Sequence, residues 1–215
     1  MPEGARVITI DEVESLPVLG GELQWHPLRH TLGIRAFGMN AYTAAKAGDL
    51  VVEEHDEGSL GHEEVYVVLA GRATFTLDGE DFDAPAGTVV HLADPKVKRV
   101  ARAVEDGTRV LAVGGPPDAA FEPSPWEPAF RAEALARQSG DPKAAAAIVR
   151  ESLEQHPDNP SVLYNTACFE ALAGYDDDAI AHLKRAIELR PESLEWAQSD
   201  DDLASLRERA DFPKS

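Results

Sequence analysis

Apolar and polar residues alternate in short runs through the first half of the chain. Runs such as RVITI (6–10), EVYVVLA (64–70) and RATFTL (72–77) are rich in Val, Ile and Thr and are separated by Gly, Pro and Asp. A period of two over such a run is typical of a β-strand that buries one face. Asp78-Gly79, which follows the third run, tolerates the positive φ angles of a tight hairpin. The pattern predicts an all-β domain over residues 1–118.

The pattern changes after this domain. Residues 115–128 read GPPDAAFEPSPWEP, and their prolines exclude both a helix interior and a central strand. We expect a linker over 119–127 and a helical domain over 128–215, where Ala, Leu, Glu and Arg dominate. Pro157 and Pro191 are 34 residues apart, as are Gly140 and Gly174. Because Gly opens turns after helices and Pro ends helices, this spacing predicts repeated helix pairs.

The segment NPSVLYNTACFEALAGYDDDAIAHLKRAIELRP (159–191) resembles a tetratricopeptide repeat. In that family, small residues let two helices approach closely and the array is used as a contact surface for other proteins. The resemblance implies a short helical array that binds a protein partner or stabilises a homodimer.

Composition and charge argue against two classes of binding partner. The formal net charge is −19 and the pI is near 4.6, so the surface repels phosphate backbones and anionic lipids. We therefore expect neither nucleic acid nor a membrane as a partner. The chain lacks eighteen consecutive apolar residues and a signal-peptide pattern, and Cys168 is its only cysteine. The expected location is the cytoplasm.

Two segments of the β-rich half carry a second resemblance. GDLVVEEHDEGSLGHEEVYVVLAG (48–71) has a Glu at 64 and a Gly seven residues later, and APAGTVVHLADP (84–95) follows it. These segments resemble the two sequence motifs of the cupin superfamily, over most of residues 20–115. The resemblance implies a cupin β-barrel (a double-stranded β-helix), and the whole chain is then an α+β multidomain protein.

Many cupins hold a metal with His and Glu ligands, and imidazole and carboxylate suit one divalent Fe, Mn, Zn or Ni ion. The residues that match, or that could substitute for, those ligands are His55, His62, Glu64 and His91. The last His of the family pattern has its place at Lys98 or Arg99, which are cations and not ligands. The alternative is that no metal binds and that Glu64 pairs with Lys98 or Arg99, because an unpaired buried carboxylate is costly.

Two functions of different kinds follow from this pattern. The first is a cupin that binds or senses a small molecule, with candidate ligand contacts at Arg29, Arg35, Tyr42 and Tyr66, and without assured catalysis. The alternative is a metal-dependent enzyme of the oxygenase or isomerase type that uses the rearranged His/Glu site. A third hypothesis is a structural protein whose barrel only dimerises. The sequence leaves open whether the protein is an enzyme.

Overall fold

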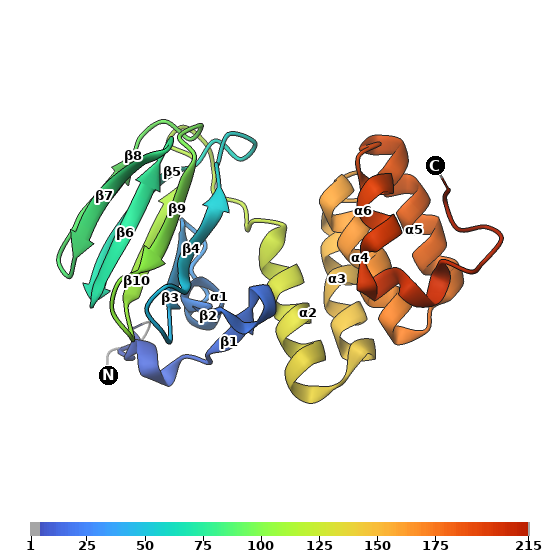
Figure 1. Ribbon diagram of the computed structural model, residues 1–215, viewed down its shortest axis with the longest axis horizontal. Helices are drawn as coiled ribbons and strands as arrows, with labels where there is room; N and C mark the ends of the chain where they lie inside the picture. Colours follow the sequence, from blue (N-terminus) through green and yellow to red (C-terminus); the bar gives the residue numbers. More distant parts are fainter. Residues whose placement is uncertain (1–4, 215) are drawn as a thin grey trace. The chain divides into compact units, whose positions relative to one another are not determined.

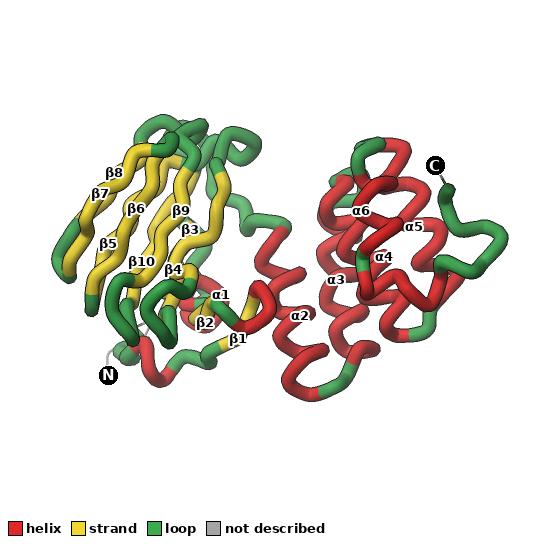
Figure 2. The backbone as a smooth tube through the Cα atoms, in the orientation of Figure 1, coloured by secondary structure: helices red, strands yellow, loops and turns green. Residues whose placement is uncertain are grey.

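The computed structural model describes residues 5–214, and the chain divides into two compact units, Met1–Pro123 and Ser124–Ser215 (Figure 1). Strands are confined to the first unit, and the four helices of fourteen residues each lie in the second (Figure 2). The first unit contains, in order, η1 (Ile10–Glu12), β1 (Leu16–Val18), η2 (Leu19–Gly21), β2 (Leu23–His26), α1 (Leu28–Leu32), β3 (Gly38–Thr43), β4 (Leu50–His55), β5 (Glu63–Ala70), β6 (Arg72–Leu77), β7 (Glu80–Pro85), β8 (Val89–Leu92), β9 (Arg99–Ala103) and β10 (Arg109–Gly115).

These strands form two antiparallel sheets that share one apolar core. The six-stranded sheet has the order β1-β2-β3-β10-β5-β8, and the four-stranded sheet has the order β4-β9-β6-β7. Tyr66 and Val68 of the first sheet belong to the same buried cluster as Phe75 and Ala101 of the second. The two sheets therefore pack face to face, as in a sandwich.

Two expectations about this unit are wrong. The hydrogen-bonded ladders form two separate sheets, so the strands do not close into the predicted barrel. The run RVITI, predicted as a strand, contains none: residues 6–9 are irregular and Ile10 begins η1. Val7 is 80% exposed, and without a buried face the apolar residues of this run lack the packing that stabilises a strand.

The predicted hairpin at Asp78-Gly79 is present between β6 and β7. Asp78 has φ 49° and Gly79 has φ 88°, the left-handed conformations of a tight hairpin turn. The same turn holds the residue before β9: the Asp78 backbone N–H donates to the Lys98 carbonyl at 2.9 Å, and Asp78 Oδ1 accepts from the Lys98 backbone N–H at 2.9 Å. We call this pair of hydrogen bonds the Asp78 clamp.

The second unit is helical. It contains α2 (Trp126–Ser139), α3 (Pro142–Gln155), α4 (Pro160–Ala173), α5 (Asp176–Leu189), α6 (Ser193–Ser199) and η3 (Asp201–Leu206). The starts of α2 and α4, and those of α3 and α5, are each 34 residues apart. Gly140 and Gly174 end α2 and α4 in the left-handed conformation, as the spacing predicted. A tetratricopeptide assignment for these helices stays a prediction.

A buried carboxylate joins three of these helices. Glu170 of α4 is fully buried and accepts hydrogen bonds from Arg150 of α3 and His182 of α5, both at 2.7 Å. Asp178 also accepts from Arg150, at 2.6 Å. Because a buried charge is stable only when it is paired, this network fixes the mutual positions of α3, α4 and α5.

None of the helices in the described part of the chain has the length and apolar character needed to span a bilayer.

Candidate functional site

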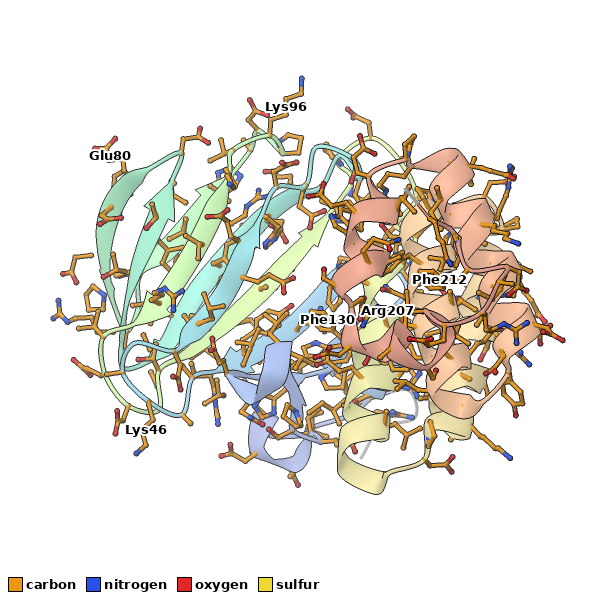
Figure 3. The ribbon with its side chains drawn as sticks, turned by 45° about the vertical axis from the view of Figure 1, so that its right-hand side comes forward. Lys46, Glu80, Lys96, Phe130, Arg207 and Phe212 are labelled. Carbon is orange, nitrogen blue, oxygen red and sulfur yellow. The ribbon has the colours of Figure 1, made fainter. Side chains whose placement is uncertain are left out.

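Polar side chains converge at one end of the apolar core of the first unit. His55 ends β4, Glu64 and Tyr66 lie near the start of β5, and Arg99 begins β9. Glu57 joins them from the loop after β4. We call these five residues the Glu64 cluster. The β8–β9 loop, which carries Lys96, lies at this end of the strands, and Lys46 marks the opposite end (Figure 3).

Strand alternation explains why these residues meet. Along β5, Glu64, Tyr66 and Val68 share one face, and the last two are buried in the core. Along β9, Arg99 shares its face with Ala101 and Ala103, which are core residues. Arg99 is paired in register with His55 on one neighbouring strand and with Leu77 on the other. The carboxylate from one sheet and the guanidinium from the other therefore point into the same space.

Hydrogen bonds define the tautomer and direction of two members. His55 Nδ1 lies 2.9 Å from the Glu53 carbonyl oxygen, and because a carbonyl only accepts, Nδ1 carries the proton. Burial lowers the pKa of His55, so the neutral ring presents its lone pair at Nε2. The Tyr66 hydroxyl donates to Glu64 Oε2 at 2.7 Å and lies 3.4 Å from His55 Nε2. Burial, followed by the charge of Glu64, raises the pKa of Tyr66, which stays a donor.

The two carboxylates differ in their surroundings. Glu57 Oε1 lies 3.8 Å from His55 Nε2, and Glu64 Oε2 lies 3.9 Å from the same atom. Burial raises the pKa of Glu57 to about 7, and the charge of Glu64 adds to this effect. Near neutral pH, Glu57 therefore exchanges a proton readily.

Arg99 is the most unusual member of the cluster. Its side chain is 0% exposed, and Nη2 lies 3.7 Å from Glu64 Oε2. None of its three side-chain nitrogens has a hydrogen-bond partner in the described structure. A buried guanidinium has five N–H donors to satisfy, and leaving them without acceptors is costly. The ion pair with Glu64 supplies charge compensation but not hydrogen bonds.

The remaining predicted metal ligands divide between the cluster and the outer surface. His62 is 7% exposed, and its Nδ1 lies 3.3 Å from Glu57 Oε2, so it borders the cluster through Glu57. Burial lowers the pKa of His62. His91 is exposed and pairs in register with Val65, on the face opposite to Glu64. Its Nε2 lies 2.5 Å from Glu63 Oε1. The structure therefore places His91 outside the cluster.

The predicted ligand contacts are likewise dispersed. Tyr66 is in the cluster, and Tyr42 packs against the same core from β3. Arg29 lies on α1, whose Leu28 packs with Ala41 on the opposite face of β3. Arg35 is exposed. Arg29 therefore lies on the side of β3 opposite to the core that holds Tyr42 and Tyr66.

In the cupin pattern the usual partner of His55 has its place at Glu53 or Glu57, and neither was chosen as a ligand. Arg99 was considered as the place of the last His and as an ion-pair partner for Glu64. Glu57 follows His55 by two residues, which is a usable spacing signal, but it lies in a loop without periodicity. For Arg99 the signal is the alternation with Ala101 and Ala103. Lys98 has the opposite direction and pairs on the surface with Glu54 at 2.5 Å. Of the two cations in the alternative reading, Arg99 is the one that reaches Glu64.

The cupin resemblance implies a divalent metal, and the cluster matches this in donor type. One atom each from His55, Glu57 and Glu64 lie within 4.8 Å of one another, and such nitrogen and oxygen donors suit first-row metals. The charge arrangement does not match, because the buried Arg99 guanidinium already stands 3.7 Å from Glu64 Oε2. A divalent ion on that oxygen would be held beside a fixed cation in a poorly solvated space. The donor atoms present suit a divalent metal but the charge of Arg99 does not, and we derive no chemistry through such an ion.

A second group of metal-type donors lies in the helical unit and has a different explanation. Cys168, Asp200 and Asp202 each offer an atom within 4.8 Å of the others. Burial raises the pKa of Cys168 well above its usual value, so the thiol keeps its proton. Asp200 Oδ2 accepts from Tyr164 at 3.0 Å and from Cys168 Sγ at 3.7 Å. These contacts account for the group as hydrogen bonding between α4 and the start of η3.

No protein-family model matches the chain, and no curated protein matches it. Among solved structures, the chain is similar to an RmlC-like cupin protein from Desulfovibrio desulfuricans, with 30% sequence identity and a TM-score of 0.34. The match covers 38% of this chain and 74% of that protein. It is also similar to KdgF from Halomonas sp. (18% identity, 49% and 90% coverage, TM-score 0.42). A third is a predicted oxalate decarboxylase from Thermotoga maritima (21% identity, 51% and 97% coverage, TM-score 0.42).

We infer nothing about fold or activity from the TM-scores, which are at most 0.42 in these three comparisons. Membership of the cupin superfamily therefore stays a prediction from the two sequence motifs.

Proposed function

We propose that the N-terminal unit binds a small molecule at the Glu64 cluster, and that the ligand presents acceptor oxygens to Arg99. The observation that carries this proposal is the fully buried guanidinium whose three nitrogens have no hydrogen-bond partner in the described structure. Buried donors are normally satisfied, and exceptions concentrate at sites of function. A carboxylate or hydroxyl group of a ligand supplies the missing acceptors.

The rest of the cluster offers both a hydrogen-bond acceptor and a hydrogen-bond donor. The lone pair at His55 Nε2 accepts, whereas Tyr66 is a donor already directed at Glu64. The side chain of His55 is 26% exposed and that of Glu64 is 12% exposed, so these residues form the edge where the cluster meets solvent. Behind them, Tyr66 and Phe75 form an apolar wall with ring centroids 5.7 Å apart. A few polar groups against apolar walls are typical of small-molecule sites.

A ligand screen by thermal shift tests this proposal. The panel contains small carboxylic acids, sugar acids and neutral sugars, and the proteins are the wild type, Arg99→Met and Arg102→Met. Arg102 lies on the same strand but is exposed, so it controls for loss of a positive charge. We expect a compound that raises Tm in the wild type and in Arg102→Met but not in Arg99→Met. If each active compound stabilises all three proteins equally, Arg99 is not a ligand contact and the proposal is wrong.

The second candidate is a metal-dependent enzyme of the oxygenase or isomerase type. The convergence of His55, Glu57 and Glu64 within 4.8 Å favours it. The buried Arg99 beside Glu64 counts against it. Elemental analysis of protein purified without an affinity tag separates the two candidates: one metal ion per chain that is lost in Glu64→Gln supports the enzyme.

For the helical unit we propose a role as a contact surface, for a protein partner or for a second copy of the chain, in the cytoplasm. A cavity of about 370 Å³ lies within this unit, and Phe130, Phe169 and Leu172 are among its lining residues. Aromatic and aliphatic anchors in a pocket are typical of protein contacts. Light scattering of the full chain, with Leu172→Glu for comparison, tests the homodimer form: a dimer mass that falls to the monomer mass in the variant supports it.

A further inference from the structure

We infer that Arg99 is the resident cation of the Glu64 cluster, in place of a divalent metal ion, and that removing its charge converts the cluster into a metal site. This inference goes beyond ligand binding, because it concerns which cation the protein itself places between its two sheets. Its failure would leave the ligand-binding proposal standing, since the two are tested by different measurements.

The position of Arg99 is the first step. It lies between His55 and Leu77 in the register of the four-stranded sheet, and its side chain is completely buried. Within the described structure, Glu64 is the carboxylate that forms an ion pair with Arg99, with Nη2 and Oε2 3.7 Å apart. Arg99 is thus a fixed positive charge directed at one of the three candidate donor residues.

The balance of charge is the second step. The cluster already contains the carboxyl groups of Glu57 and Glu64 and the positive guanidinium of Arg99. A divalent ion added to this set would give an excess of positive charge in a space where water does not screen it well. Without the guanidinium, the same ion would meet two carboxylates and one imidazole, a donor set that suits Mn²⁺ or Zn²⁺.

The third step is that two of the three donors, His55 and Glu64, are positioned without help from Arg99. The Glu53 carbonyl accepts from His55 Nδ1 and so leaves Nε2 as the ligand atom. Tyr66 donates to Glu64 and orients its carboxylate. Such supporting hydrogen bonds are what orient metal ligands in proteins. Neutralising Arg99 therefore leaves His55 and Glu64 already arranged, with Glu57 beside them.

The experiment is a calorimetric titration with Mn²⁺ and with Zn²⁺ on tag-free, chelator-treated full-length protein. The variants are Arg99→Met, the charge-preserving Arg99→Lys and the exposed control Arg102→Met. Glu64→Gln is made alone and in combination with Arg99→Met. We expect Arg99→Met to bind one ion per chain at least 100-fold more tightly than the wild type. Arg99→Lys and Arg102→Met should bind like the wild type, and the double variant should lose the added affinity.

Two results would overturn the inference. One is a wild type that binds one ion per chain as tightly as Arg99→Met, with binding lost in Glu64→Gln. The other is an Arg99→Met protein that is folded by circular dichroism and binds no better than Arg102→Met. If Arg99→Met does not fold, Arg99→Gln replaces it. If neither folds, the wild-type titration decides: Glu64-dependent stoichiometric binding refutes the inference, and its absence supports it.

Discussion

Replacing Glu64 by Gln should destabilise the N-terminal unit far more than the size of the change suggests. The substitution keeps an oxygen that accepts from Tyr66, but it removes the charge that compensates the buried Arg99. For unit charges 3.7 Å apart, the attraction is about 4.5 kcal/mol at an effective dielectric constant of about 20. Since the variant no longer buries the Glu64 charge, part of this is offset. We expect a net loss of about 3 kcal/mol in the free energy of unfolding.

The assay is urea denaturation at pH 7, combined with hydrogen exchange of the segments that contain β5 and β9. Hydrogen exchange assigns the change to the N-terminal unit, because each segment is followed separately. Glu63→Gln is the matched control on the same strand: its side chain is 42% exposed and its partner, His91, is on the outer face. Exposed ion pairs contribute about 1 kcal/mol or less, so the control should change little.

The reasoning is refuted if Glu64→Gln and Glu63→Gln lower the free energy of unfolding by equal amounts. That result would mean that Arg99 is compensated by groups other than Glu64. A slower exchange of β9 amides in Glu64→Gln than in the wild type would contradict the reasoning in the same way.

Three further predictions concern other parts of the chain. Glu170→Gln should lower the stability of the helical unit by about 2–4 kcal/mol in urea denaturation, because it weakens two charge-assisted hydrogen bonds at a fully buried position. The control Glu188→Gln, at a side chain 66% exposed, should change the stability by less than about 1 kcal/mol. Equal effects of the two variants would contradict the prediction. Burial lowers the pKa of His26, so the contribution of this residue to stability is present above the unfolded pKa of about 6.5 and is lost as the pH falls below that value. In thermal unfolding between pH 8 and pH 5, the Tm of His26→Gln should therefore fall less than the Tm of the wild type. Identical pH profiles of the two proteins would contradict this. Gly71→Ala should lower Tm sharply, because Gly71 has φ 70° and a Cβ there would lie 2.5 Å from Thr108 Oγ1. The control Gly79→Ala should lower Tm less, because Gly79 has φ 88° but open space around the position of a Cβ.

The elements with strong periodicity could be predicted from the sequence. The alternation in EVYVVLA and RATFTL corresponds to β5 and β6, and the Asp78-Gly79 hairpin joins β6 to β7. The helices of the second unit end near the glycines and prolines that the 34-residue spacing indicated. Closure of a barrel could not be predicted, because it depends on hydrogen bonds between strands that are distant in the sequence, and the period along one strand does not report them.

The site was predictable only in part, for a related reason. A period of two correctly places Glu64 and Tyr66 on one face of β5. Whether His91 points into the core, and whether Lys98 or Arg99 does so, depends on strand registers that the sequence does not show. Glu57 lies in a loop, where periodicity gives no direction at all. The metal, the ligand and the use of the helical unit stay predictions.

The Asp78 clamp has a consequence for the chemistry of the Glu64 cluster. Lys98 and Arg99 are adjacent cations, and successive residues of a strand point to opposite faces. By binding both backbone groups of Lys98, the turn between β6 and β7 determines that the planar guanidinium enters the core and that the amine stays in water. A shift of one residue at this turn would exchange the two and deliver a compact, strongly hydrated ammonium instead. A hairpin loop that touches neither His55 nor Glu64 thereby selects which type of cation faces them.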